Sequence, residues 1–218
     1  MFALVENQQI TKFYSGNKGV TLGDIQYPKS IFTLWSKAER EAISIYEVVF
    51  DNSNKKDEQW YINTNPSYAF AITDGVGQVT STYGTATPKA HADTLYTQED
   101  VDDDVDDNGD RISDFSVGDV KTRGLKYNLI QTIKKQAAGI LQDTDWYVVR
   151  KADAGTAVPS AITTHRAAVR TKAAEMETAI TNAADTPALE TLYTYVNTGT
   201  EENPVYERPL GEFPVLES

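Results

Sequence analysis

The chain has 218 residues, 40% of them hydrophobic, which is enough apolar material for one large or two small domains with a buried core. The formal net charge is −12, but the segment 99–119 holds ten acidic residues and one basic residue. The rest is therefore nearly neutral, without the basic patch that nucleic acid binding needs, and the absence of cysteine excludes disulfides, thiolate metal sites and cysteine nucleophiles.

Residues 1–84 contain short runs rich in Tyr, Val, Ile and Thr that are separated by Asn, Asp, Gly and Pro. Such runs are typical of strands joined by tight turns. The predicted strands are Phe2–Val5, Ile10–Tyr14, Ile45–Phe50, Gln59–Thr64, Tyr68–Ile72 and Gln78–Tyr83. Ser36 and Glu39 have the spacing of a capping box, which opens one short helix. We predict a small antiparallel β domain with this helix packed on it, in the α+β class.

Residues 85–122 are poor in large apolar side chains and rich in Asp, so they are predicted to form an acidic loop or linker. Part of this segment copies the first positions of a calcium-binding loop, with candidate ligands Asp104, Asp106, Asn108 and Asp110. The glutamate that should close such a loop is replaced by Phe115. A solvated acidic loop is the favoured interpretation, and a calcium site is the alternative.

Apolar residues recur at helical spacing in three stretches of the segment 123–198. The first stretch follows Leu125, the second runs from about Pro159 to Asn182, and the third begins at the capping residue Asp185. We therefore predict a bundle of about three helices. His165 falls on the apolar side of the second helix, where a packed core histidine is expected.

The segment 199–218 alternates prolines and glycines with apolar residues, so it cannot form regular structure of its own. We expect an extended C-terminal arm that lies along another surface. Its candidate partner-binding residues are Tyr206, Leu210, Phe213 and Leu216.

No motif for a nucleophile, a phosphate-binding loop or a zinc site is present, and His91, the other histidine, has no partner motif. We therefore predict no catalytic residues, no enzymatic activity and no cofactor apart from the calcium alternative. No run approaches the ~20 apolar residues that span a bilayer, and the N-terminus lacks the features of a signal peptide. The expectation is a protein that does not bind membranes.

Two groups of short motifs resemble a known family. In the C-terminal half, Thr-Asp-Trp at 144–146 is followed by Pro159 and by His-Arg-Ala-Ala-Val-Arg at 165–170. In the N-terminal half, the segments 2–7, 27–28 and 34–41 look like the opening of related marine-phage proteins. The chain thus resembles bacteriophage tail assembly chaperones and tail-fibre assembly proteins. Thr164 and His165 stand where that family usually has aromatic residues.

The resemblance implies a non-enzymatic structural protein of the phage tail or tail fibre, made in the host cytoplasm and then held in the virion. Its partners would be other tail or fibre proteins, and an oligomer is expected. A transient assembly chaperone is the alternative, and a glycan-cleaving tail enzyme is a remote one. The matching residues Asp145, Trp146, Arg166 and Arg170 are expected either to brace two helices or to face a partner. In the first case the indole of Trp146 packs on the next helix with one of the two guanidinium groups stacked over it, and Asp145 forms an ion pair with one of the arginines. If the indole is buried, Trp146→Ala should cost about 3 kcal/mol.

Overall fold

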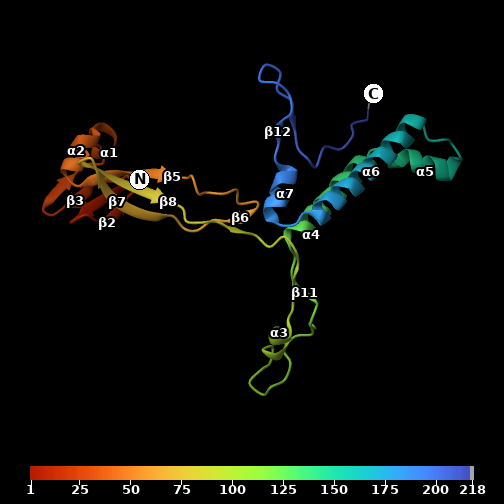
Figure 1. Cartoon of the computed structure of the whole chain (residues 1–218), viewed down its shortest axis with the longest axis horizontal. Coiled ribbons are helices and arrows are strands. Elements are labelled where there is room, and N and C mark those ends of the chain that lie inside the picture. Colours follow the sequence, from red (N-terminus) through yellow and green to blue (C-terminus); the bar gives the residue numbers. More distant parts are fainter. Residues whose placement is uncertain (217–218) are drawn as a thin grey trace. The chain divides into compact units, whose positions relative to one another are not determined.

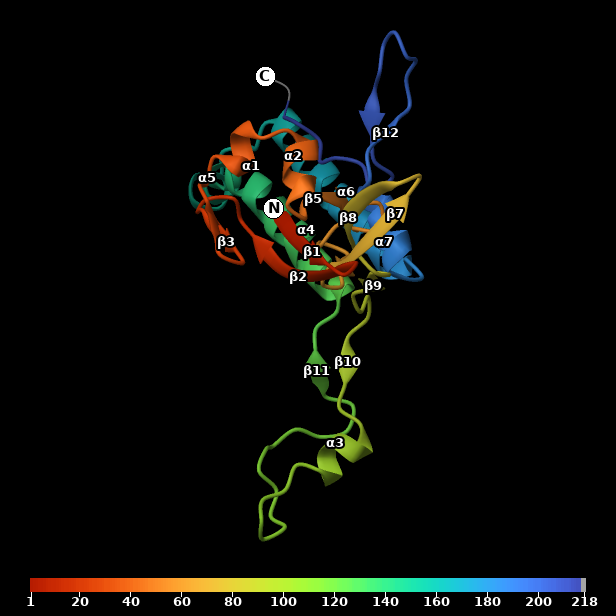
Figure 2. The same ribbon diagram turned by 90° about the vertical axis from the view of Figure 1, so that its left-hand side faces the viewer.

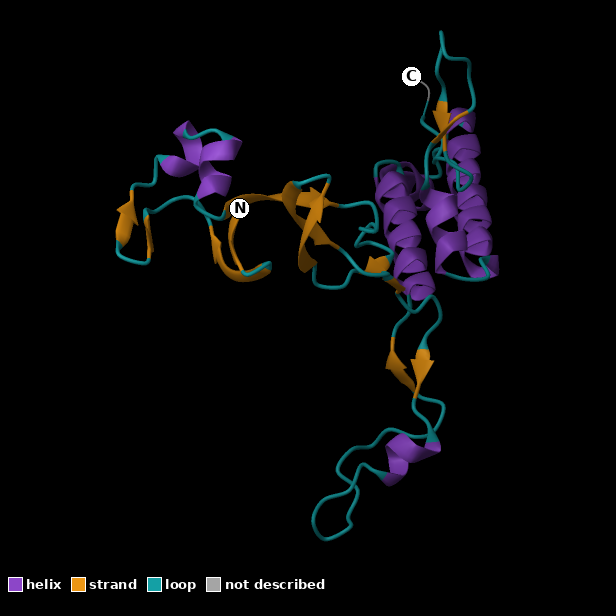
Figure 3. Cartoon of the chain, turned by 60° about the vertical axis from the view of Figure 1, so that its left-hand side comes forward, coloured by secondary structure: helices purple, strands orange, loops and turns teal. Residues whose placement is uncertain are grey.

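The protein is described from a computed structural model, which defines residues 1–216 (Figure 1). It is a mixed α+β protein, with a sheet of several strands in the N-terminal half and helices in the C-terminal half, as predicted (Figure 3). The chain divides into two compact units, and the division lies between Thr87 and Pro88. The boundary predicted from the sequence lies at residue 84, and the acidic segment belongs to the second unit.

The first unit is built on a five-stranded sheet in the order β2-β1-β5-β8-β7. The strands are β1 (Phe2–Glu6), β2 (Gln9–Tyr14), β5 (Ile45–Asp51), β7 (Ser67–Thr73) and β8 (Val76–Thr82). β5 and β8 run parallel, whereas the other neighbours are antiparallel, so the prediction of a purely antiparallel sheet is wrong. The cause is the long connection after β5, which leads to the outer strand β7. The β7–β8 hairpin then turns back and inserts β8 beside β5.

Apolar side chains on both faces of this sheet are buried. On one face Phe2 and Ile45 pack against Ile31, and on the other face Ala3, Val48 and Val79 form a second cluster. The remaining elements of the unit are β3 (Val20–Leu22), β4 (Ile25–Tyr27), α1 (Ile31–Leu34), α2 (Lys37–Ala42), β6 (Tyr61–Ile62) and, at the boundary, β9 (Thr87–Pro88).

The predicted capping box forms at the start of α2. The backbone N–H of Ser36 donates to Glu39 Oε2 at 2.7 Å, and the N–H of Glu39 donates to Ser36 Oγ at 3.3 Å. The local sequence alone therefore accounts for where this helix begins.

Within the segment 123–198, for which about three helices are predicted, the structure has four. They are α4 (Leu125–Gln142), α5 (Asp145–Ala154), α6 (Ser160–Asn182) and α7 (Thr186–Tyr193). α4 and α6 pack lengthwise (Figure 3), and their core contains Ile133, Val169, Met176 and Ile180. Helix α5 escaped prediction because its apolar residues 146–149 are consecutive and do not follow the spacing of a buried helix.

The acidic segment forms a hairpin rather than a structureless linker, and we call residues 89–124 the acidic hairpin (Figure 2). It contains β10 (Thr94–Leu95), α3 (Gln98–Asp102) and β11 (Val120–Thr122). Its base is fastened to the start of α4, where Asp93 accepts a hydrogen bond from the N–H of Gly124 at 2.8 Å and pairs with Arg123 at 2.7 Å. A second, short hairpin pairs β12 (Val196–Asn197) with β13 (Tyr206–Glu207). Since β13 lies within the predicted arm 199–218 and has a partner strand before it, the extended C-terminal arm begins after β13 and not at residue 199.

Candidate docking site on the helical unit

Arg166 is the centre of the site. Its side chain is buried in α6, although arginine is rarely buried without partners. Nη1 donates to the carbonyl oxygen of Leu141 and to Thr144 Oγ1, each at 2.7 Å, and Nη2 lies 2.9 Å from Asp145 Oδ1. Arg166 therefore joins the end of α4, the start of α5 and the N-terminal third of α6. The ion pair expected between Asp145 and one of the two arginines is formed with Arg166.

The geometry explains why an arginine occupies this position. The last carbonyl groups of a helix have no partner within the helix, and a buried one must be satisfied by another donor. Thr144 is also buried, and its hydroxyl donates to Leu141 O at 3.0 Å while accepting from Arg166. The planar guanidinium can serve both oxygens and the carboxylate at once, which a lysine ammonium cannot do in the same geometry.

The sequence predicts that Trp146 stacks with Arg166 or Arg170, and this prediction is wrong. Trp146 is 52% exposed, and the guanidinium over its ring is that of Arg150, at 4.5 Å from the ring centre. Because residues 145–154 form a helix, Arg150 lies one turn after Trp146 on the same side. Arg170 is exposed and donates to Arg166 O at 3.4 Å. The spacing of Trp146 and Arg150 was the signal that could have revealed both the stack and the helix.

Replacing Trp146 with alanine should therefore cost about 1 kcal/mol of unfolding free energy, well below the ~3 kcal/mol expected for a buried indole. The lost contribution is the half-covered ring and its contact with Arg150. Urea denaturation followed by circular dichroism would measure it. A loss above about 3 kcal/mol would show that the indole is buried in the folded protein.

Helix α5 presents an apolar surface to solvent. None of its ten residues is buried, and its exposed side chains include Trp146, Val148 and Val149. Isolated helices of this length are marginal in water, so α5 depends on the bonds at its first residue and on the helix end at Gly155, which adopts the left-handed conformation.

The C-terminal arm lies on the helices of its own unit, and this corrects the expectation that its apolar residues are all free for a partner. Leu210 is buried, and its N–H donates to the carbonyl oxygen of Leu192 at 3.0 Å. Arg208 pairs with Glu212 at 2.7 Å. Tyr206, which lies in β13 before the arm turns inward, is 64% exposed and remains accessible.

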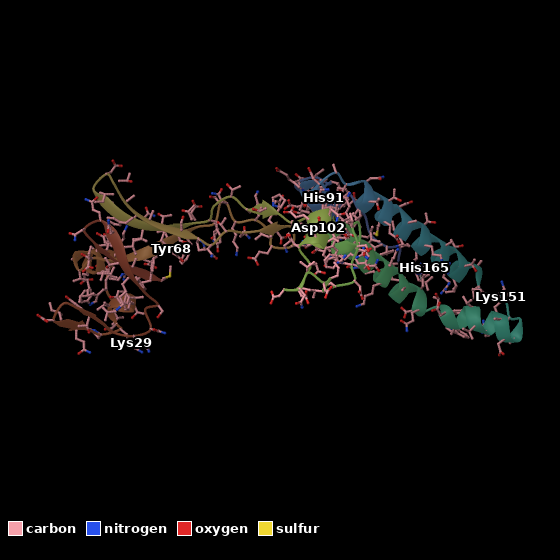
Figure 4. The ribbon with its side chains drawn as sticks, turned by 90° about the horizontal axis from the view of Figure 1, so that it is seen from below. Lys29, Tyr68, His91, Asp102, Lys151 and His165 are labelled. Atoms are coloured by element: carbon pink, nitrogen blue, oxygen red, sulfur yellow. The ribbon has the colours of Figure 1, made fainter. Side chains whose placement is uncertain are left out.

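Beyond Leu210 the arm crosses from α4 towards α6. Phe213 and Leu216 line a pocket of about 320 Å³ together with Ile140, Thr144 and the buried His165 of α6 (His165 is labelled in Figure 4). Burial of His165 agrees with its predicted place on the apolar side of the helix. Leu216 is 38% exposed, so the end of the described arm covers this pocket only partly.

The candidate calcium ligands face their own loop. Asp106 Oδ1 accepts hydrogen bonds from the N–H groups of Asn108 and Asp110 at 2.8 and 2.9 Å, and these contacts lower the pKa of Asp106. Asp104 accepts from the N–H of Ser113 at 2.7 Å. Within residues 1–216, no three histidine or carboxylate side chains are grouped so as to hold a metal ion.

The acidic hairpin is held together by aromatic and charged contacts instead of a core. The rings of Tyr96 and Phe115 are stacked at 3.7 Å, and Lys121 lies over Tyr96. Lys121 also forms an ion pair with Asp100. This contact and a hydrogen bond from the N–H of Thr97 lower the pKa of Asp100 to about 2. Two cross-strand contacts thus meet near the base of α3.

Acid should loosen this hairpin. Since the pKa of Asp100 falls from 3.8 to about 2 on folding, the contact stabilises the hairpin above about pH 4 and is lost as the pH falls towards 2. Amide shifts of Thr97 and Lys121 in NMR spectra should move to random-coil values over this range. In Asp100→Asn they should already be shifted at pH 7. A hairpin that keeps its native shifts at pH 2 would contradict this role for Asp100.

None of the helices in residues 1–216 combines the length and hydropathy needed to cross a membrane. Comparison of the chain with models of known protein families, with curated proteins and with solved structures finds no match.

Proposed function

We propose that this chain is a non-enzymatic structural protein of a bacteriophage tail or tail fibre, and that it works by docking on neighbouring proteins of the particle. The observation that carries the docking role is α5, a helix that buries none of its residues and exposes Trp146 and Val149, which lie three positions apart on the same side of the helix. Exposed apolar side chains grouped on one element are typical of surfaces that become covered by another protein. The resemblance at residues 144–170 supports the assignment to the phage tail.

The same helix explains how the two possible roles of the motif are divided. Asp145 and Arg166 form the brace, because their bonds hold the three helices together. Trp146 and Val149 are free to meet a partner, because neither is buried. A partner that covers them would supply the stabilisation that the isolated helix lacks.

Mass spectrometry of purified particles tests the structural role. We expect this chain in virions at a fixed ratio to the other tail proteins. Its absence from virions together with abundance in the lysate would reject the structural role and favour the transient chaperone.

A pair of substitutions tests the docking surface. Val149→Asp should reduce incorporation into particles at least about tenfold while leaving the melting temperature nearly unchanged, because Val149 is 64% exposed. Lys151→Ala is the control, since it changes the net charge by the same amount about 200° around the helix. Equal incorporation of both variants would show that α5 is not the docking surface.

A further inference from the structure

Strand β7 is an edge strand without the features that usually protect one. It is the last strand of the five-stranded sheet (β7 is labelled in Figure 1). Six of its seven residues are exposed. It contains no charged residue and no proline, and its pairing with β8 runs from Ser67 to Thr73 without a register shift. β8 also carries no charge. Exposed strands of this kind readily pair with another chain, so proteins normally blunt them with charges, prolines or bulges.

The opposite edge of the same sheet has such protection. Strand β2 carries Lys12, and its pairing with β1 is interrupted by a register shift between Leu4 and Val5. The two edges therefore differ in the property that controls pairing with other chains. This contrast within one sheet indicates that another chain pairs with β7.

The sequence of β7 fits a second copy of itself. An antiparallel pair centred on Ala71 would place Phe70 of one copy opposite Ile72 of the other, and Ala69 opposite Thr73. The first pair is aromatic against β-branched, a favourable combination across strands. Ile72 is 55% exposed in the single chain and would be covered in the pair. No like charges would meet.

The choice of centre follows from a contact inside the first unit. Phe13 of β2 packs on Tyr68 near the start of β7, with ring centres 4.7 Å apart (Tyr68 is labelled in Figure 4). A pair centred on Ala71 uses residues 69–73 and leaves this contact in place. A pair centred further towards Tyr68 would compete with β2.

We propose that β7 pairs antiparallel with β7 of a second copy of this chain, around a twofold axis at Ala71, so that two five-stranded sheets form one continuous sheet. Such an isologous contact is the commonest way in which identical subunits associate. The proposal does not depend on the assignment to a phage tail, because it uses only the first unit.

Single-cysteine crosslinking tests the register. The natural chain has no cysteine, so Ala71→Cys introduces one thiol per copy. Directly opposite residues in an antiparallel pair have Cα atoms about 4.5–5.5 Å apart, within reach of a disulfide. Ala71→Cys should therefore form a dimer rapidly under mild oxidation, whereas Gln78→Cys, on the neighbouring strand opposite Ala71, should not. Equal crosslinking of the two variants would overturn the proposed register.

Sedimentation equilibrium of the full chain tests the association itself. We expect a reversible dimer for the natural chain and for Gln78→Lys, and dimerisation weakened at least about tenfold for Ala71→Lys, because two added charges would face each other across the axis. Mixing Ala71→Lys with Ala71→Glu should restore the dimer. A monomeric natural chain, or a dimer that Ala71→Lys leaves unchanged, would overturn the proposal.

Discussion

Replacing Arg166 with alanine is expected to lower the unfolding free energy of the helical unit by about 3 kcal/mol. The substitution removes the charged donor from the buried hydroxyl of Thr144 and from the carbonyl of the half-buried Leu141, which keeps its bonds from Thr144. Asp145 contributes less to the loss, because its carboxylate is 56% exposed and can be hydrated. Hydrogen exchange measured by mass spectrometry should show faster exchange throughout α4, α5 and α6 while peptides of the first unit are unchanged.

Arg170→Ala is the matched control, since it removes the same side chain one turn later on the same helix. Arg170 is exposed, so its loss should cost less than about 0.5 kcal/mol. Similar exchange rates in the two variants would mean that Arg166 is not the brace between the helices.

Gly124→Ala is expected to disrupt the base of the acidic hairpin and to destabilise the helical unit by about 2–3 kcal/mol. A Cβ atom at Gly124 would lie 2.3 Å from the backbone carbon and oxygen of Ala92, and neither can move as a flexible side chain would. The backbone shift that relieves this clash would also break the bond from the N–H of Gly124 to Asp93. Thermal unfolding followed by circular dichroism would measure the loss.

Gly139→Ala, inside the helix α4 that Gly124 precedes, provides a control of opposite sign. A Cβ at Gly139 meets no atom within 4 Å, so alanine should raise stability by about 0.5–1 kcal/mol through its better helix propensity. If Gly124→Ala were as stable as Gly139→Ala, the close approach at the hairpin base would not exist in solution.

Local signals in the sequence located the elements that depend on local contacts. The start of α2 was predictable because the residues of its capping box lie three positions apart. The positions of α4 and α6 were predictable because each buries one continuous apolar face. The parallel pairing of β5 with β8 was not predictable. It depends on where the chain re-enters the sheet after residue 66, and the residues of the two strands carry no signal for that position.

The candidate site shows the same division. Pairing of Asp145 with an arginine could be expected from charge. That Arg166 is the partner could not, because it depends on the contact of Arg166 with Leu141, 25 positions earlier in the chain. The arm was predicted to lie on a surface, yet only the fold shows that Leu210 is buried against its own helices. The sequence predicts an acidic loop or linker at residues 85–122 but not its hairpin, because the stack of Tyr96 on Phe115 joins residues far apart in sequence.

The bonds of Arg166 also set an order of events during folding. α5 buries no residue of its own, so it is not stable by itself. It should form only after α6 has docked on α4 and placed the guanidinium of Arg166 beside Asp145 in the first turn of α5. Pairing of α4 with α6 should therefore come early, and ordering of α5 should be among the last steps. The helix that becomes ordered last on folding should also be the first to unfold locally in the native protein, so α5 should open more easily than α4 or α6. It is then the helix best able to adapt its shape to a partner.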